Sequence, residues 1–288
     1  MRFTTTSRCL SLTGMSVVGI AVLAASGAGA QSDVRQNPPT DSALAAITER
    51  GRDLAAYDAV AWHATDALEA TPADTSFKPG IPAWYAIRHD SAGWAVAFGR
   101  ISAALDTMFI AAVVSRPDTV TQYSVQVFRP PRPDTGYYAR SARAAEIASR
   151  DFGSFPRPYN VTVIPASGGD WWVYVYPAAT QTGVWLLGAD QRDRVSADGR
   201  AILERRRLHR SILEYRSDSG SADEKLTARV HSAVLDNVPE DTDVFVVLER
   251  RPQVPEYIGT ALFDYRIDVD GQIHYLGRRA NQDKALPR

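Results

Sequence analysis

The second half of the chain is divided into hairpins by three short turn sequences. Residues 167–170 (Ser-Gly-Gly-Asp), Asp198-Gly199 and Asp270-Gly271 each separate two segments rich in β-branched and aromatic residues. Glycine at these positions tolerates the positive φ angles of tight hairpin turns. We therefore predict three antiparallel pairs of strands: 159–164 with 171–176, 184–195 with 201–213, and 262–269 with 272–276.

The first half of the chain carries two helix patterns. Apolar residues recur at helical spacing from Ile47 to Leu68, behind a capping residue at Asp41. A second helix is predicted over 137–150, with Gly153 at its C-terminal end. Further strands are predicted over 84–87, 94–98, 108–114, 123–128, 227–235 and 243–248, and a loop over the proline-rich residues 129–134.

These patterns predict an α+β fold, in which a predominantly antiparallel sheet of hairpins packs against two or three helices. Hydrophobic residues make up 45% of the chain and charged residues 23%, which excludes general disorder. We expect a single composite α+β domain over 41–278, with 129–134 as the one alternative sub-boundary. A frayed tail is expected over 279–288.

The N-terminal residues 1–30 have the features of a secretory signal peptide. Arg2 and Arg8 precede an apolar stretch over 10–25, and Ala28-Gly29-Ala30 forms a small-x-small cleavage site. Residues 31–40 are polar and contain two adjacent prolines, which predicts a flexible lead-in. We therefore expect export, with cleavage near Ala30 and a periplasmic or secreted location.

Composition excludes several classes of function. The one cysteine, Cys9, lies in the signal segment, so the mature chain has no disulfide, thiol catalysis or Cys-ligated metal. The formal net charge of −1 argues against a nucleic-acid partner. No later segment offers the roughly 20 apolar residues of a stable membrane span. The sequence also lacks the GxSxG, Walker, GxGxxG and HExxH motifs, so no complete catalytic motif is present.

The predicted hairpin at Asp198-Gly199 carries the first candidate site. If pairing is counted outward from a two-residue turn, four polar side chains share one face of the hairpin. Arginine offers paired donors to phosphate, sulfate or carboxylate, so this face is a candidate anion-binding surface. The alternative is a solvated sheet face in a chain rich in arginine. The four residues are Asp190, Arg192, Arg205 and Arg207.

The second candidate is a cluster of imidazole and carboxylate groups late in the chain. Histidine and carboxylates together bind divalent metals, or supply a base and an orienting acid. The alternative is an acidic loop around Pro239, in which the carboxylates solvate a turn. The cluster comprises His209, His231, Asp236, Glu240 and Asp243.

Several segments together resemble exported bacterial proteins of uncharacterised function: Trp84-Tyr85-Ala86, Trp172-Val173-Tyr174, Gly188-Ala189-Asp190-Gln191-Arg192, Ser196-Ala197-Asp198-Gly199, Leu235-Asp236-Asn237-Val238-Pro239 and Asp243-Val244-Phe245. The resemblance covers most of the mature chain and implies no chemistry or catalytic residue. It implies that Asp190, Arg192, His231, Asp236, Glu240 and Asp243 are neighbours in one site.

Two functional hypotheses follow, and the sequence leaves open whether the protein is an enzyme. The first is a non-catalytic exported protein, without a cofactor, that binds an unknown envelope or extracellular ligand or partner. The alternative is a metal-assisted hydrolase centred on His231 and the nearby carboxylates, with a divalent metal as cofactor.

Overall fold

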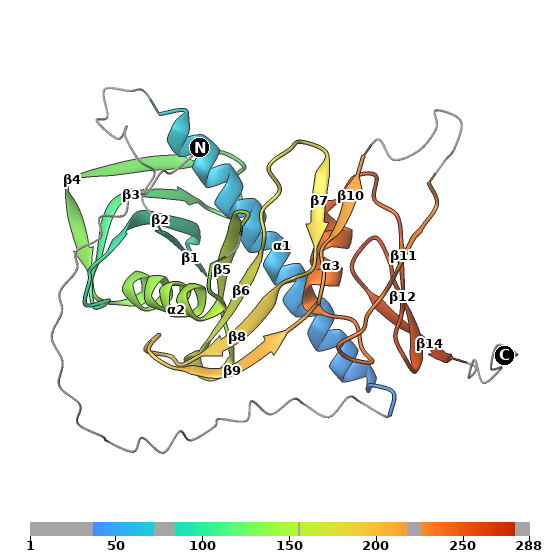
Figure 1. Ribbon diagram of the computed structural model, residues 1–288. Helices are drawn as coiled ribbons and strands as arrows, with labels where there is room; N and C mark the ends of the chain where they lie inside the picture. The colour runs from blue at the N-terminus through green and yellow to red at the C-terminus, as the bar shows by residue number, and fades with distance from the viewer. Residues whose placement is uncertain (1–36, 72–83, 155, 218–225, 280–288) are drawn as a thin grey trace, which may run out of the picture. The chain divides into compact units, whose positions relative to one another are not determined.

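The computed structural model describes residues 37–71, 84–154, 156–217 and 226–279. Within these residues the chain forms three α-helices, a short 3-10 helix and fourteen strands in mostly antiparallel sheets (Figure 1). The α+β prediction is therefore confirmed. The expected signal segment 1–30, the first part of the lead-in and nearly all of the tail lie outside the described residues.

The first sheet is an antiparallel meander in the order β1-β2-β3-β4. Its strands are β1 (Trp84–Asp90), β2 (Gly93–Ile101), β3 (Met108–Arg116) and β4 (Ser124–Asp134). The predicted loop over 129–134 is wrong, because these residues form the second half of β4. Strand β4 lies at the sheet edge, where a proline at a position facing away from β3 removes no ladder hydrogen bond. A register shift opposite Ile110 and Ala112 accommodates the interruption.

The second sheet has the order β5-β6-β8-β9, and a separate pair is formed by β7 and β10. The hairpins at 167–170 and Asp198-Gly199 are confirmed, with a short 3-10 helix, η1 (Ser167–Gly169), in the first turn. The strand predicted over 184–195 is broken into β7 and β8, and the strand predicted over 201–213 ends at Arg207, so that β10 begins only at Leu213. The elements are β5 (Tyr159–Pro165), β6 (Trp171–Pro177), β7 (Val184–Leu187), β8 (Gln191–Val195), β9 (Ile202–Arg207) and β10 (Leu213–Arg216).

The third sheet has the order β11-β12-β13-β14. It contains the predicted hairpin at Asp270-Gly271, and its first two strands are parallel. The strands are β11 (Arg229–Ser232), β12 (Glu256–Gly259), β13 (Phe263–Ile267) and β14 (Ile273–Arg278).

Two of the three helices match the sequence patterns. The cap of helix α1 (Asp41–Glu69) lies one residue earlier than expected, at Thr40 instead of Asp41, and the Thr40 hydroxyl accepts the Ala43 N–H at 3.2 Å. Helix α2 (Tyr137–Phe152) ends at Gly153, as predicted. Its first turn is capped by Asp134 Oδ2, which accepts the Ala139 N–H at 2.9 Å.

Helix α3 (Asp241–Glu249) replaces the strand predicted over 243–248. Its valines favour strands intrinsically, but tertiary burial overrides this preference. Residues 241–247 are all buried, so the segment shows no amphipathic stripe by which a helix is recognised.

The helices join the sheets into a shared core. The small residues Ala139 and Ala142 of α2 pack on the first sheet, and Ala145 and Ala148 pack on the second. Helix α1 contacts β2, β3, β5 and β14 as well as α3 (Figure 1). A Cβ atom added to Gly51 of α1 would lie 2.5 Å from the Val244 Cβ, so glycine allows α1 and α3 to approach closely. No described helix combines the length and hydropathy that a membrane span requires.

Candidate metal centre

Helix α3 starts with four consecutive polar residues, Glu240 to Asp243, and all four are buried. Glu240 is the N-cap, and its backbone N–H donates to Asp243 Oδ2 at 2.7 Å. An acidic side chain three positions after the cap stabilises a helix start, because it accepts a backbone N–H that the helix leaves unpaired. This bond fixes the Asp243 carboxylate through Oδ2 and leaves Oδ1 for the neighbouring segments.

His209 lies between β9 and β10, opposite the break between β7 and β8. Gly188 allows the break: its φ is +107°, and an added Cβ would lie 2.0 Å from the Ser211 carbonyl oxygen. Asp190 follows, and its Oδ1 accepts the His209 backbone N–H at 3.0 Å and lies 3.0 Å from His209 Nδ1. The Thr242 hydroxyl donates to Asp190 Oδ2 at 2.6 Å. Asp190 therefore orients the His209 ring.

His231 lies on β11, and the parallel pairing with β12 places it beside Ile258. Its Nδ1 atom is 2.8 Å from Glu256 Oε1, at the first residue of β12. Arg250, the residue that ends α3, donates to Glu256 Oε2. Glu256 and Arg250 are each only 1% exposed, so a buried ion pair holds the carboxylate that orients His231.

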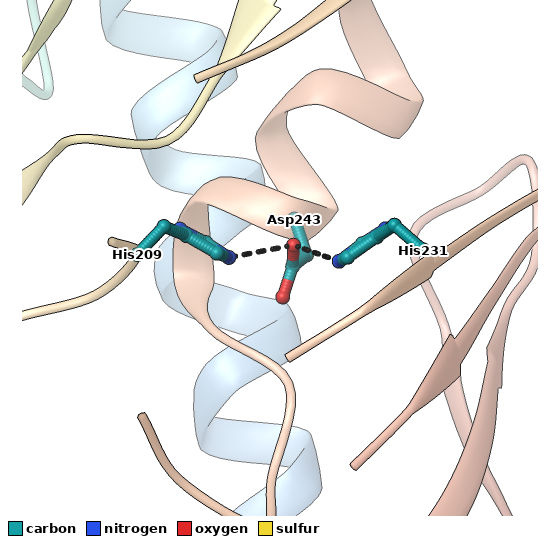
Figure 2. Close-up of side chains that lie close together, drawn as sticks. All are labelled: His209, His231 and Asp243. Carbon is teal, nitrogen blue, oxygen red and sulfur yellow. Dashed lines mark hydrogen bonds and ion pairs between the residues drawn. The ribbon is translucent and has the colours of Figure 1, made fainter. Parts of the chain in front are cut away.

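The two imidazoles converge on Asp243 (Figure 2). His209 Nε2 lies 3.1 Å and His231 Nε2 lies 3.2 Å from the same atom, Asp243 Oδ1. The three donor atoms are all within 4.8 Å of one another. The His231 contact has the distance of an ion pair, but His231 Nε2 has no hydrogen-bond partner among the described residues. Figure 2 shows the rings approaching the carboxylate from opposite sides.

Burial and charge act in opposite directions on these groups. Burial opposes a charged His209, but Asp190 and Asp243 outweigh it and hold the pKa of His209 well above its ordinary value. Burial likewise opposes charge on His231, whereas Asp243 and Glu256 raise its pKa to about 9. Burial alone would raise the pKa of Asp243, but the two imidazoles hold it well below its ordinary value.

The buried cluster contains more carboxylates than fixed cations. With neutral imidazoles, Asp190, Asp243 and Glu256 carry three negative charges, and Arg250 carries one positive charge. Two charges must be neutralised, because uncompensated charge is costly in a buried site. Two protons on the imidazoles achieve this, and so does one divalent cation between them.

The hydrogen bonds at Nδ1 decide which atoms the imidazoles offer to an ion. A carboxylate at Nδ1 keeps the proton on that nitrogen, so a neutral ring presents the lone pair of Nε2. Both rings have this arrangement, with Asp190 behind His209 and Glu256 behind His231. The cluster therefore presents two imidazole nitrogens and one carboxylate oxygen, a donor set that divalent transition metals accept.

The predicted imidazole–carboxylate cluster is divided by the structure. His209, His231 and Asp243 come together and form a triad. Asp236 and Glu240 bind Arg206 instead, with Arg206 Nη2 at 2.8 Å from Asp236 Oδ2 and 2.6 Å from Glu240 Oε1. These two carboxylates lie beside the triad along the chain but are engaged with a different cation.

The predicted anion-binding face of Asp190, Arg192, Arg205 and Arg207 is wrong, because the strands pair in a different register. A bulge between Arg194 and Val195 shifts the register by one residue, so Arg192 pairs with Arg206 rather than Arg205. Arg205 is opposite Asp193 and binds Asp151, and Arg207 is opposite Gln191 and lies over the Phe152 ring. Asp190 lies beyond the strand and faces His209. The four residues therefore do not share one face of the sheet, and Asp190 serves to orient His209.

Two residues of the site, Glu256 and Arg250, carry no recognisable signal in the amino-acid sequence. Glu256 follows Pro255 at the start of a short strand, and Arg250 is one of many arginines. Each acquires its position from packing between α3 and the third sheet. Asp241 lies between the candidate residues Glu240 and Asp243, yet its partners Arg50 and Arg192 come from α1 and β8. Only the tertiary structure brings Asp241 together with Arg50 and Arg192.

No protein-family model, curated protein or solved structure matches the chain.

Proposed function

We propose that this protein is a metalloprotein that binds one divalent transition-metal ion, of the zinc class, through His209, His231 and Asp243. The observation that carries the proposal is the convergence of two Nε2 atoms and one carboxylate oxygen within 4.8 Å. The exported location expected from residues 1–30 is part of the proposal, which places the metalloprotein outside the cytoplasm.

The distances within the triad support a single shared ion. Two ligands bound to one tetrahedral zinc at about 2.1 Å are about 3.4 Å apart. Asp243 Oδ1 lies 3.1 Å from one Nε2 atom and 3.2 Å from the other, and the three donor atoms are within 4.8 Å of one another, so side-chain shifts would bring all three to one ion. The outer carboxylates support it further, because metal-bound imidazoles usually donate their second N–H to such a group.

The position of the triad supports a structural role for the ion. Its ligands come from three segments that are distant in sequence: the β9–β10 connection, β11 and the start of α3. The side chains of His209 and His231 are only 9% and 4% exposed. One buried ion would tie the third sheet and α3 to the second sheet, and metal-binding energy would become folding energy.

Metal-assisted hydrolysis is the second candidate function. Catalytic zinc sites have three protein ligands and a water in the fourth position, whereas structural sites have four protein ligands. The triad offers three, and this number favours an ion that retains a water. The bound water would be the nucleophile.

The test is a Zn²⁺ titration of the full chain, expressed without a His-tag and stripped of metal with EDTA. We expect one equivalent to bind and the melting temperature to rise. The variant Asp243→Asn retains an oxygen that accepts the Glu240 N–H but loses the anionic ligand, so it should fold and bind zinc at least tenfold more weakly. His274→Ala is the matched control, since His274 is half-exposed and paired with Asp268 on the third sheet.

Failure of the wild-type chain to bind zinc, manganese or cobalt would overturn the proposal without reference to any variant. Equal loss of binding in His274→Ala and Asp243→Asn would assign the ion elsewhere. Hydrolysis of p-nitrophenyl esters by the zinc-loaded chain, abolished by Asp243→Asn, would favour the catalytic candidate. Stoichiometric zinc without any such turnover would favour the structural role.

A further inference from the structure

A second site lies at the N-cap of α3, where Glu240 lines a cavity that includes none of the three triad residues. It is a cavity of about 250 Å³ between α1 and the second sheet. Its polar wall consists of Arg50, Arg192, Arg206 and Glu240, and the rest is formed by small apolar side chains of α1 and by Val238. Three guanidinium groups thus face one space with a single carboxylate among the lining residues.

The arginines are held in place by carboxylates behind the wall. Asp241 is fully buried, and its Oδ1 accepts from Arg50 Nε at 3.1 Å and Arg50 Nη2 at 2.9 Å. Its Oδ2 accepts from Arg192 Nη1 and from the Tyr174 hydroxyl. One buried carboxylate serves two guanidinium groups, and the second carboxylate near Arg192, that of Glu204, is half-exposed and 3.6 Å away, so the positive charge at Arg50 and Arg192 is only partly balanced by buried groups. Arg206, at the other end, is balanced by its own carboxylate partners.

Arg192 has unused hydrogen-bonding capacity. Its side chain is 9% exposed, and within the described part of the chain its Nε atom is buried without a hydrogen-bond partner. The guanidinium lies over the Trp172 ring at 4.7 Å, which fixes its plane, and Nη2 is 3.6 Å from Glu204. A buried donor without an acceptor is costly, and an anion within hydrogen-bond reach of this atom would remove that cost.

We propose that this cavity binds a small organic anion, with an oxyanion head on Arg50 and Arg192 and a short apolar body against α1 and Val238. Carboxylate and phosphate both accept paired hydrogen bonds from guanidinium groups, so either head satisfies the donors. The small volume restricts the body to a few carbon atoms. This site is independent of the metal proposal, since it uses none of the three triad residues.

The test is isothermal titration of the EDTA-treated full chain with butyrate and with butyl phosphate, each compared with acetate and inorganic phosphate. We expect butyrate to bind at least tenfold more tightly than acetate, because each of its two extra methylenes contributes about 0.8 kcal/mol, or about fourfold, when buried. Butyl phosphate should exceed inorganic phosphate by more than this, because its apolar body is four carbons long. The head group of the tighter ligand identifies the natural chemistry. Absence of binding by all four anions would overturn the proposal.

Substitutions of single residues test where the anion binds. Arg50→Ala should weaken binding by tenfold or more, whereas Arg52→Ala on the same helix should leave it unchanged, because Arg52 is directed to Asp270. Arg50→Lys serves if Arg50→Ala fails to fold, and should weaken binding severalfold through loss of the paired donors. Binding that survives Arg50→Ala but is lost in Asp243→Asn would place the anion at the triad and contradict the proposal.

Discussion

Metal binding at the triad should compete with protons, and the structure sets the size of the effect. Zinc requires the Nε2 lone pairs of His209 and His231, whereas in the metal-free chain the surrounding carboxylates favour protonated rings. The pKa of His231 is about 9, so at pH 7 its proton alone weakens the apparent zinc affinity by about a hundredfold. His209, whose pKa is also raised, adds to this penalty.

The assay is calorimetric titration of Zn²⁺ at pH 7 in two buffers that differ in protonation enthalpy. The difference in measured heat gives the number of protons released, and we expect a value close to two per ion. Competition with a chelator between pH 6 and pH 8 should show the dissociation constant rising as pH falls. The trend should approach a hundredfold change per pH unit, because two protons compete with one ion.

Proton release close to zero, together with an affinity that does not change between pH 6 and pH 8, would refute this reasoning. Such a result would mean that the imidazoles are not the ligands, even if zinc binds. His274→Ala should leave both the proton count and the pH dependence unchanged, because His274 lies outside the triad.

Three further predictions concern stability and the residues around the triad. In EDTA, the melting temperature should fall as the pH rises from about 6.5 to 9. The raised pKa of His231 stabilises the folded chain below pH 6.5 by on the order of 3 kcal/mol, and this stabilisation is lost as the pH rises through the folded-state pKa of about 9. Bound zinc should abolish the fall. Glu256→Gln should weaken zinc affinity about 10–100-fold in chelator competition, and the exposed Glu214→Gln should not. Gly51→Ala should lower the free energy of unfolding, measured in urea, by about 1–3 kcal/mol, because the added Cβ would collide with Val244. Alanine stabilises an isolated helix relative to glycine, so a higher free energy of unfolding would contradict the close packing of α1 on α3.

Local sequence patterns predicted the elements that local forces determine. The turns at Asp198-Gly199 and Asp270-Gly271 form hairpins because glycine there adopts φ angles of +74° and +85°. The apolar spacing from Ile47 to Leu68 predicted α1, and Gly153 marked the end of α2. Each of these features depends on residues within one turn or one helix face, so the chain itself contains the information.

Elements determined by tertiary contacts were not predictable in the same way. Helix α3 is rich in valine and forms a helix because its start is capped by buried polar residues and its body is enclosed. The break at Gly188 divides the strand predicted over 184–195 into β7 and β8, and no turn motif in the sequence indicates this break. One bulge near Val195 was enough to invalidate the predicted arginine face, since a shift of one residue exchanges the two faces of a strand.

The site was partly accessible from sequence. His209, His231 and Asp243 were all among the candidate ligands, because imidazole and carboxylate are the groups that bind metal. Their selection from a larger set required the structure: the cap places Asp243, the strand break places His209 against Asp190, and the parallel β11–β12 pair places His231 against Glu256. Each of these is a contact between distant segments.

The metal content of the native chain decides whether His209, His231 and Asp243 hold an ion. The full-length protein would be purified without a His-tag from a host that exports it, and analysed for transition metals by mass spectrometry before any metal is added. We predict about one zinc-class ion per chain and a lower melting temperature after EDTA treatment. A metal-free protein that also fails to take up zinc, with a melting temperature that EDTA leaves unchanged, would contradict the account.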